Sequence, residues 1–257
     1  MSGLINRHAV WAIYKFEMSR AIRTIWQSLV TPVITTSLYF LVFGSAIGSR
    51  MSDMAGIPFG SFIVPGLILL SVLTQALMNA SFGIFFPKFT GTIYEILSAP
   101  LSPLETVTAY VGAAATKAVI LALVTLATAT LFVDVWVAHP LLMLLFLIAI
   151  SIGFCLMGFA IGIWAKNFEQ LQVIPLLVVT PLTFLGGVFY SVNAIGEPWR
   201  TVTLLNPILY LVAGYRWTFF GVSDVPLAAS VAVMAAAILV PLGAIIWIFK
   251  TGYRLKQ

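Results

Sequence analysis

Long runs without a charged side chain are the feature that most constrains how this chain can fold. Five runs contain no Lys, Arg, Asp or Glu: residues 24–49, 54–87, 135–165, 170–196 and 225–249. Crossing the hydrocarbon core of a bilayer takes about 20 apolar residues in a helix, so each run is long enough to cross. The sequence therefore predicts repeated membrane crossings.

The membrane also dictates the secondary structure, because unpaired backbone groups are not tolerated in hydrocarbon and helices pair them internally. We expect an all-α membrane protein that forms one transmembrane domain over residues 1–257. Its six spans are expected at about 29–49, 61–85, 107–133, 139–164, 170–191 and 227–249. Composition supports this class, because 8% of the residues are charged against about 25% in soluble domains.

The basic residues predict the orientation of these spans, since Lys and Arg concentrate on the cytoplasmic side of membrane proteins. Six spans place both termini on one side. That side receives ten of the thirteen basic residues: Arg7, Lys15, Arg20, Arg23, Lys88, Lys117, Lys166, Lys250, Arg254 and Lys256. The opposite side receives Arg50, Arg200 and Arg216. Both termini are therefore expected in the cytoplasm, and residues 195–226 outside.

Residues 1–28 carry too many charges for a span. Apolar residues such as Trp11, Tyr14 and Met18 recur at helical spacing, while Lys15 and Arg23 fall on another face. This pattern predicts an amphipathic helix in the cytoplasmic interface of the membrane. Two interpretations are open: a simple anchor before the first span, and a connecting helix that packs against a cytoplasmic partner.

The external segment, residues 195–220, has a different pattern. Thr201–Tyr215 is uncharged, but it is too short to cross and is interrupted by Asn206 and Pro207. We expect a re-entrant or interfacial helical segment, which is tolerated at membrane depth where it packs on protein or lines a cavity. The many aromatic residues near this segment form either an interfacial belt or an exit gate.

The candidate residues of an outer gate are Phe184, Gly186, Gly187, Phe189 and Tyr190. The paired glycines weaken the helix where the chain should meet the outer interface. They allow a movable bend or gate, and a tight turn without motion explains them equally well.

Few residues offer chemistry. No Asp or Glu lies in the centre of an expected span, and Lys117 is the one ionisable residue within a span. Its long side chain either extends back to the inner interface or has a function of its own. Cys155 is the only cysteine, which excludes an intrachain disulfide. With no GxxxxGK[ST] loop and no nucleophile beside a base, we expect no catalytic, cofactor-binding or metal-binding residues.

Four motifs, in order, resemble a known family. They are "FIVPGL" at 62–67, "EILSAPLS" at 95–102, "TPLTFLGGVFYSV" at 180–192 and "NPILYLVAGYRW" at 206–217, which "FFGVSDV" follows at 219–225. Together they resemble the permeases of the ABC (ATP-binding cassette) type-2 exporter family, in the bacterial branch that exports drugs, polysaccharides and lipo-oligosaccharides. The resemblance runs along nearly the whole chain and leaves the exported substrate open.

The resemblance implies that residues 88–99 form a cytoplasmic coupling helix that docks on a separate ATPase subunit. The matching positions for this contact are Lys88, Thr92, Ile93, Glu95 and Leu97. The family often has an Arg early in this helix and a pair of acidic residues later, where this chain has Gly91 and Tyr94–Glu95. Glu95 is therefore either a partner contact or a solvated charge.

By the same resemblance, two copies of this chain would assemble with two ABC ATPase subunits in the bacterial cytoplasmic (inner) membrane, in contact with lipids and without nucleic acid. ATP and Mg would be bound by the ATPase, and this chain would hold no cofactor. The alternatives are a secondary transporter or channel that works without ATP, and a membrane-bound enzyme or structural subunit. The first needs ionisable groups within the spans, and the second needs a convergent catalytic set.

Overall fold

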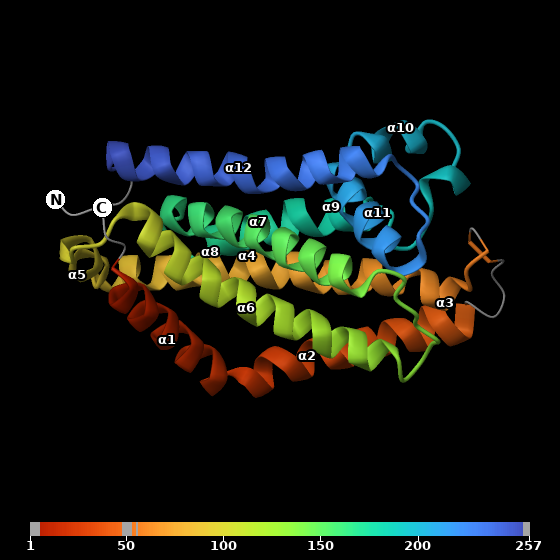
Figure 1. Cartoon of the computed structure of the whole chain (residues 1–257), viewed down its shortest axis with the longest axis horizontal. Helices are drawn as coiled ribbons and strands as arrows, with labels where there is room; N and C mark the ends of the chain where they lie inside the picture. Colours follow the sequence, from red (N-terminus) through yellow and green to blue (C-terminus); the bar gives the residue numbers. More distant parts are fainter. Residues whose placement is uncertain (1–5, 48–52, 55, 254–257) are drawn as a thin grey trace.

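The computed structural model describes residues 6–47, 53–54 and 56–253, and its regular elements in these ranges are helices that run mostly along one axis (Figure 1). The long helices are α1 (Arg7–Arg23), α2 (Ile25–Tyr39), α4 (Val64–Thr90), α6 (Pro103–Ala129), α7 (Pro140–Trp164) and α12 (Leu227–Thr251). The short ones are α3 (Phe59–Phe62), α5 (Ile93–Ser98), α8 (Phe168–Ile174), α9 (Thr180–Phe184), α10 (Trp199–Leu204) and α11 (Pro207–Phe220).

Five helical segments among the described residues are long and apolar enough to cross a membrane. They are Ile25–Gly44, Phe59–Thr90, Pro103–Ala129, Pro140–Trp164 and Leu227–Thr251. They coincide with five of the six expected spans. Gly48, Ser49 and Arg50, at the end of the first expected span and just beyond it, lie outside the described residues.

The remaining expected span, 170–191, is a shorter apolar helix, Phe168–Phe184. It comprises α8, a π-helical segment at Pro175–Val179, and α9. The chain leaves the helix after Phe184, and Gly187 adopts a left-handed φ of 75°. Because glycine enters this region at no steric cost, the Gly-Gly pair accounts for the early end of the helix.

Helix α4 lies at the centre of the bundle. In its apolar window 72% of the residues are buried, against 17% in the windows that contain α2 and α12. It packs closely on α7, where a Cβ atom at Gly158 or Gly162 would overlap the backbone carbonyls of Leu77 and Ser81. Small residues spaced by four allow helices in a membrane to approach in this way. This glycine pair therefore packs within the chain.

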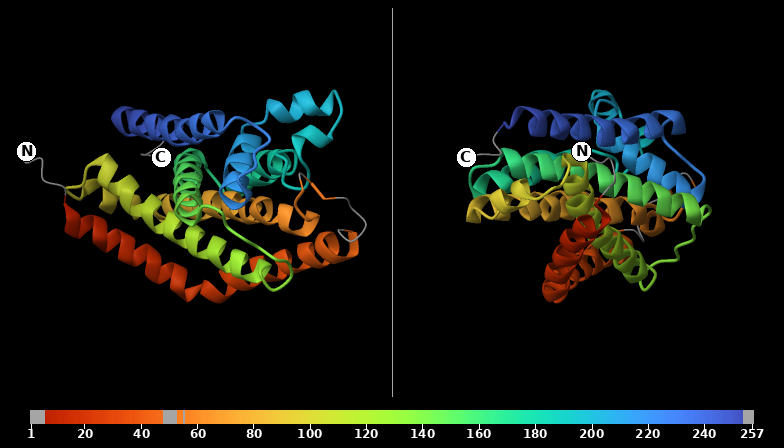
Figure 2. Two further views of the ribbon diagram at one scale, coloured as in Figure 1. Left: turned by 45° about the vertical axis from the view of Figure 1, so that its right-hand side comes forward. Right: turned by 60° about the vertical axis from the view of Figure 1, so that its left-hand side comes forward.

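The two ends of the bundle differ. The start of α1, the end of α12 and the short helix α5 lie at one end, whereas α3, α10 and α11 lie at the other (Figure 1). Figure 2 shows the same separation from two further directions. Asn206 causes the break between α10 and α11, because its side chain caps α11 and Pro207 occupies the first turn.

Helix α1 leans on α6 and meets α2 at Thr24, so that the two form an elbow (Figures 1 and 2). The hydroxyl of Tyr14 donates to Thr116 Oγ1 over 3.1 Å, and the backbone N–H of Asn6 donates to Glu105 at the capping box of α6. Residues 7–23 are therefore helical, as expected, and are fastened to the bundle along one side.

Candidate functional site

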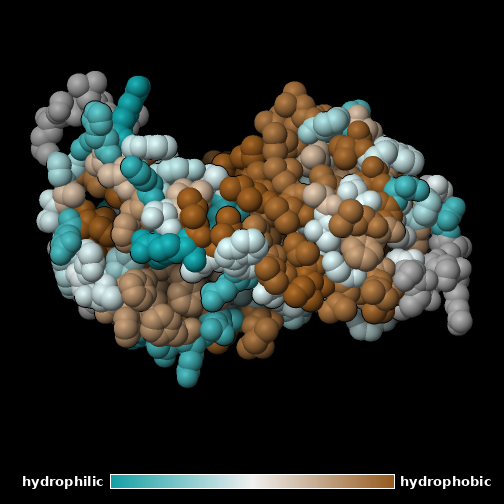
Figure 3. Space-filling model, turned by 90° about the horizontal axis from the view of Figure 1, so that it is seen from below, coloured by the Kyte–Doolittle hydropathy of each residue, from teal (hydrophilic) through white to brown (hydrophobic). Residues whose placement is uncertain are grey.

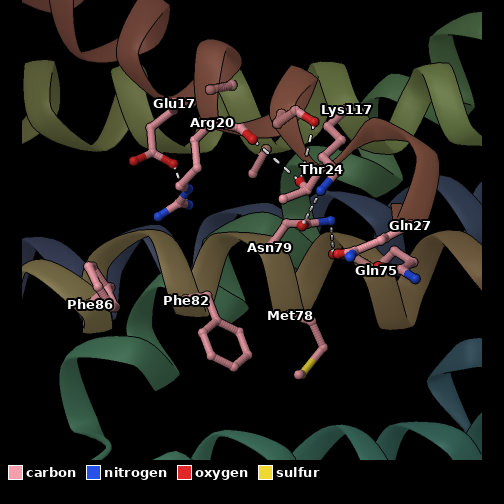
Figure 4. Close-up of a pocket in the computed structure, with 13 residues that line it drawn as sticks. Glu17, Arg20, Thr24, Gln27, Gln75, Met78, Asn79, Phe82, Phe86 and Lys117 are labelled. Atoms are coloured by element: carbon pink, nitrogen blue, oxygen red, sulfur yellow. Dashed lines mark hydrogen bonds and ion pairs between the residues drawn. The ribbon is translucent and has the colours of Figure 1, made fainter. Parts of the chain in front are cut away.

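A polar cavity of about 570 Å³ lies between the α1–α2 elbow, α4 and α6 (Figure 4). Each helix contributes residues spaced by three or four, which places them along one face. The lining residues are Glu17, Arg20, Ala21, Thr24 and Gln27 from the elbow, Gln75, Met78, Asn79, Phe82 and Phe86 from α4, and Ala113, Ala114 and Lys117 from α6. The three alanines leave room that larger side chains would fill.

The carboxylate of Glu17 is the buried charge of this cavity. Its side chain is 8% exposed and forms an ion pair of 2.5 Å with Arg20, one turn further along α1. Its second oxygen, Oε1, has no hydrogen-bond partner within the described part of the chain. Burial raises the pKa of Glu17, and the positive charges of Arg20 and Lys117 oppose that rise.

Lys117 faces the cavity from α6 and bridges to α4. Its Nζ donates to Asn79 Oδ1 over 2.9 Å, and Asn79 Nδ2 donates in turn to the backbone carbonyl of Gln75 over 2.8 Å. Asn79 lies about 16 Å along α4 from its end at Thr90, at about 1.5 Å per residue. The ammonium therefore lies between α6 and α4 in this structure, and a function of its own stays a prediction.

The cavity has a polar side and an apolar side. Figure 4 shows Glu17, Arg20, Asn79 and Lys117 gathered above the α4 ribbon, while Met78 and Phe82 extend to the other side of it. Phe82 stacks on Phe168 of α8 at a centroid distance of 6.1 Å. Such a site can bind a molecule that has both a polar and an apolar part. Sequence analysis singled out Lys117 and missed Gln75 and Asn79, although two amides at an i, i+4 spacing in an apolar span were a usable signal.

A second candidate site is the junction between α4 and α5, where the sequence predicts the contact with an ATPase. Helix α4 continues to Thr90 and ends at Gly91, whose φ is 82°, so the expected segment 88–99 comprises the last turn of α4 and then α5. Lys88 Nζ donates to the carbonyls of Ile163 over 2.6 Å and Ala165 over 3.1 Å. Since both carbonyls lie at the end of α7, Lys88 fastens the two helices together.

The five residues expected at this contact divide by burial. Thr92 and Glu95 are exposed, Lys88 and Leu97 are half-buried, and Ile93 is buried. The buried and half-buried side chains hold α5 against the bundle, and the other face of α5 remains open. Sequence analysis did not select Phe89 and Tyr94, whose side chains are exposed at the same end. Aromatic residues next to a short polar segment were the available signal.

The five residues of the expected outer gate lie together at the opposite end. Phe189 packs against Phe184 at a centroid distance of 5.5 Å and against Phe43 at 5.0 Å. The hydroxyl of Tyr190 donates to the carbonyl of Leu185 over 2.8 Å. Gly186 and Gly187 are buried beside this cluster. The segment is thus packed between the first span and α9.

Arg216 of α11 holds this segment, and sequence analysis treated it only as an external charge. Its Nη2 donates to the carbonyl of Gly187 over 2.6 Å, and its Nη1 lies 3.5 Å from Asp224 Oδ2. The guanidinium also lies 3.8 Å from the centroid of the Phe62 ring. A single arginine within an apolar helix was the signal for this role.

The apolar helices, the cavity between them and the exposed helix α5 are the features of a multi-span membrane protein. Residues 8–220 match the model of the family described as ABC-2 type transporter. The "Inner membrane transport permease YadH" of Escherichia coli (strain K12) is 38% identical over 236 residues, which cover 90% of this chain and 92% of that protein. "Nodulation protein J" of Rhizobium leguminosarum bv. viciae is 25% identical over 244 residues, which cover 93% and 92%.

This chain therefore belongs to the ABC-2 type transporter family. It is the membrane permease subunit of an ATP-binding-cassette exporter. The resemblance inferred from the four motifs is confirmed, and the alternative of an ATP-independent transporter falls away.

Proposed function

We propose that this permease moves its substrate out of the bacterial cytoplasm by using movement that a separate ABC ATPase delivers to α5. The observation that carries the proposal is the continuity from α5 to the centre of the bundle. Helix α5 packs on the end of α4 through Ile93, and Lys88 ties that end to α7. A displacement of α5 therefore reaches the two helices that form the core.

The proposed assembly contains two copies of this chain and two ATPase subunits, and it is the ATPase subunits that bind ATP and Mg and hydrolyse the nucleotide. Thr92 and Glu95 supply polar contacts to the ATPase, and the exposed Tyr94 adds apolar area between them. Helices α2 and α12, largely exposed in the isolated chain, supply apolar surface for the second copy and for lipid. We expect no catalytic or cofactor-binding residue in this chain.

The proposed topology has six crossings in the inner membrane, with the shorter helix Phe168–Phe184 as the fifth and both termini cytoplasmic. The end of the bundle that carries α5 faces the cytoplasm, and the end that carries α10 and α11 faces outward. The segment 195–220 re-enters from outside and lies over the candidate gate. The distribution of basic residues and the arrangement in Figure 1 support this topology.

The contact on α5 can be tested by reversing one charge. In a membrane preparation that also contains an ABC ATPase encoded beside this chain, Glu95→Lys should reduce co-purification of the ATPase by at least about tenfold, because like charges then meet across the contact. Glu197→Lys makes the same change at the opposite end of the bundle and should co-purify normally. Equal co-purification of the two variants, at equal membrane levels, would show that α5 is a linker without a role in docking.

A further inference from the structure

The polar cavity carries an inference about what the permease binds. Charged side chains at membrane depth are costly and normally pair with one another or face water or a ligand. Glu17 and Arg20 pair with each other, whereas the one hydrogen bond that Lys117 makes among the described residues is to the neutral amide of Asn79. An ammonium has three N–H donors. The other two face the cavity, where water or a ligand can accept from them.

The charges that line the cavity sum to a positive value, because Arg20 and Lys117 face the single carboxylate of Glu17. The amides of Gln27, Gln75 and Asn79 add neutral hydrogen-bonding groups to the same wall. Cations and amides together suit an anion such as a phosphate or carboxylate, which accepts hydrogen bonds from both.

The free oxygen of Glu17 adds a second requirement. A buried oxygen atom without a partner costs free energy until it accepts a hydrogen bond. Because Glu17 is more than nine-tenths buried and lines the cavity, a bound molecule that donates an O–H or N–H group would satisfy its Oε1. A head group with both an anion and a hydroxyl or amine fits both observations.

The apolar residues of the cavity favour an anion carried on a lipid-like molecule over a free anion. Met78, Phe82 and Phe86 border the cavity, and Phe86 is exposed. Figure 3 shows the face that includes α1 and α2: hydrophilic residues gather toward the α1 end, and hydrophobic residues cover the α2 part beside them. An acyl chain could therefore lie along apolar surface while its head group is in the cavity.

We propose that this cavity binds the negatively charged head group of an amphiphile from the inner leaflet, with Lys117 and Arg20 on the anion and Glu17 on a head-group donor. A head-group site in the inner half of the membrane would set the class of substrate, so the inference deepens the proposed function. It rests on the proposed function for the direction in which the substrate moves. Binding itself needs neither the ATPase nor transport, so it can be measured independently.

The test uses the full-length chain, purified in a neutral detergent, with short-chain phosphatidic acid as the probe and native mass spectrometry or thermophoresis as the readout. Phosphatidylcholine with the same chains and inorganic phosphate form the comparison arms. We expect saturable binding of phosphatidic acid and at least about tenfold weaker binding of the other two. Equal binding of inorganic phosphate would show a free-anion site, and equal binding of phosphatidylcholine would show a site that does not read charge; both outcomes overturn the proposal.

Variants locate the site. Lys117→Met should weaken binding of phosphatidic acid at least about tenfold, as expected for the loss of one charged hydrogen bond. Lys117→Arg should restore most of it, which separates loss of charge from a folding defect. Lys15→Met removes the same charge from the exposed face of α1 and should bind as the unaltered chain does. If Lys15→Met and Lys117→Met weaken binding equally, the lipid is attracted by surface charge and the cavity is not its site.

Glu17→Gln tests whether the negative charge of the site opposes binding of the anion. Glutamine keeps an oxygen that accepts a hydrogen bond and loses the negative charge, so phosphatidic acid should bind more tightly. Weaker binding would mean that the negative charge of Glu17 favours the lipid rather than repels it, and would overturn the assignment. Loss of lipid binding in Lys117→Met with normal ATPase co-purification would show that head-group binding is separate from ATPase docking on α5.

Discussion

Arg216 concentrates three interactions at one buried position. Its guanidinium joins the carbonyl of Gly187, the carboxylate of Asp224 and the ring of Phe62, which come from three separate segments near the end of the bundle that carries α3 and α10. Arginine suits this position because its planar group donates in several directions and also packs on an aromatic face. The conformation of the Gly-Gly segment therefore depends on a residue 29 positions away in the sequence.

Replacing Arg216 by Met should destabilise the fold by about 3–5 kcal/mol, because Asp224 is then left buried without its counter-charge. Thermal unfolding of the purified protein in detergent measures the loss as a lower melting temperature. Arg200→Met removes an exposed charge of the same end and should change the melting temperature little. Identical melting of both variants would mean that Arg216 does not hold the segment.

Between elements, the contact of α4 with α7 is the closest in the bundle. Gly158 and Gly162 face the α4 backbone directly, and a Cβ atom at either position would overlap a carbonyl group of Leu77 or Ser81. The obstructing atoms belong to backbone, which cannot turn aside as a side chain can. The two helices would have to separate to admit even a methyl group.

Gly158→Ala should therefore cost at least about 1–3 kcal/mol, the range typical of an overpacked core. Gly243→Ala supplies the matched control, since Gly243 lies in α12 and a Cβ there meets no atom within 4 Å. Alanine favours a helix over glycine, so that control should unfold at the same temperature as the unaltered chain or slightly higher. Equal melting temperatures of Gly158→Ala and Gly243→Ala would mean that the contact at Gly158 is not tightly packed.

At the scale of the whole molecule, the two ends of the bundle carry different short helices, α5 at one end and α3, α10 and α11 at the other. The proposed orientation places Ser98 of α5 inside and Glu197, just before α10, outside. Both residues are exposed in the structure, so a cysteine at either position is available to a reagent. The native Cys155 is buried. Replacing it leaves the introduced cysteine as the one thiol in the chain that can react with the reagent.

In a Cys155→Ala background, a membrane-impermeant maleimide should label Glu197→Cys in intact cells and should label Ser98→Cys only after the membrane is opened. Labelling of either cysteine is measured as slower migration of the extracted protein on a denaturing gel. Labelling of Ser98→Cys from outside would reverse the proposed orientation and with it the site of ATPase docking.

The spans were the part of the fold that could be predicted from sequence. Hydrophobic length is a local property, so five of the expected spans coincide with helices suited to crossing. The shorter helix at Phe168–Phe184 was less predictable, because apolar residues continue past Leu185 and the chain turns at Gly187 instead. Hydrophobicity alone does not show where a glycine takes a left-handed conformation.

The candidate sites were less predictable because they depend on pairs far apart in the sequence. Lys117 could be singled out as the lone charge in a span, but its contact with Asn79 follows from how α4 packs on α6. Lys88 was expected at a partner surface, and its bonds to the end of α7 follow from how α4 packs on α7. Periodicity assigns a residue to a face of its own helix and does not identify the helix opposite.

The glycines between α4 and α7 also limit which parts of the permease can move during a transport cycle. Two helices in contact through their backbones have no long side chains between them to re-pack, so a small separation opens an empty gap that nothing nearby fills. Such a contact is either closed or fully broken. We therefore expect the changes of shape that admit and release a substrate to occur where side chains form the boundary, as along α2, while the α4–α7 pair turns or tilts as one body.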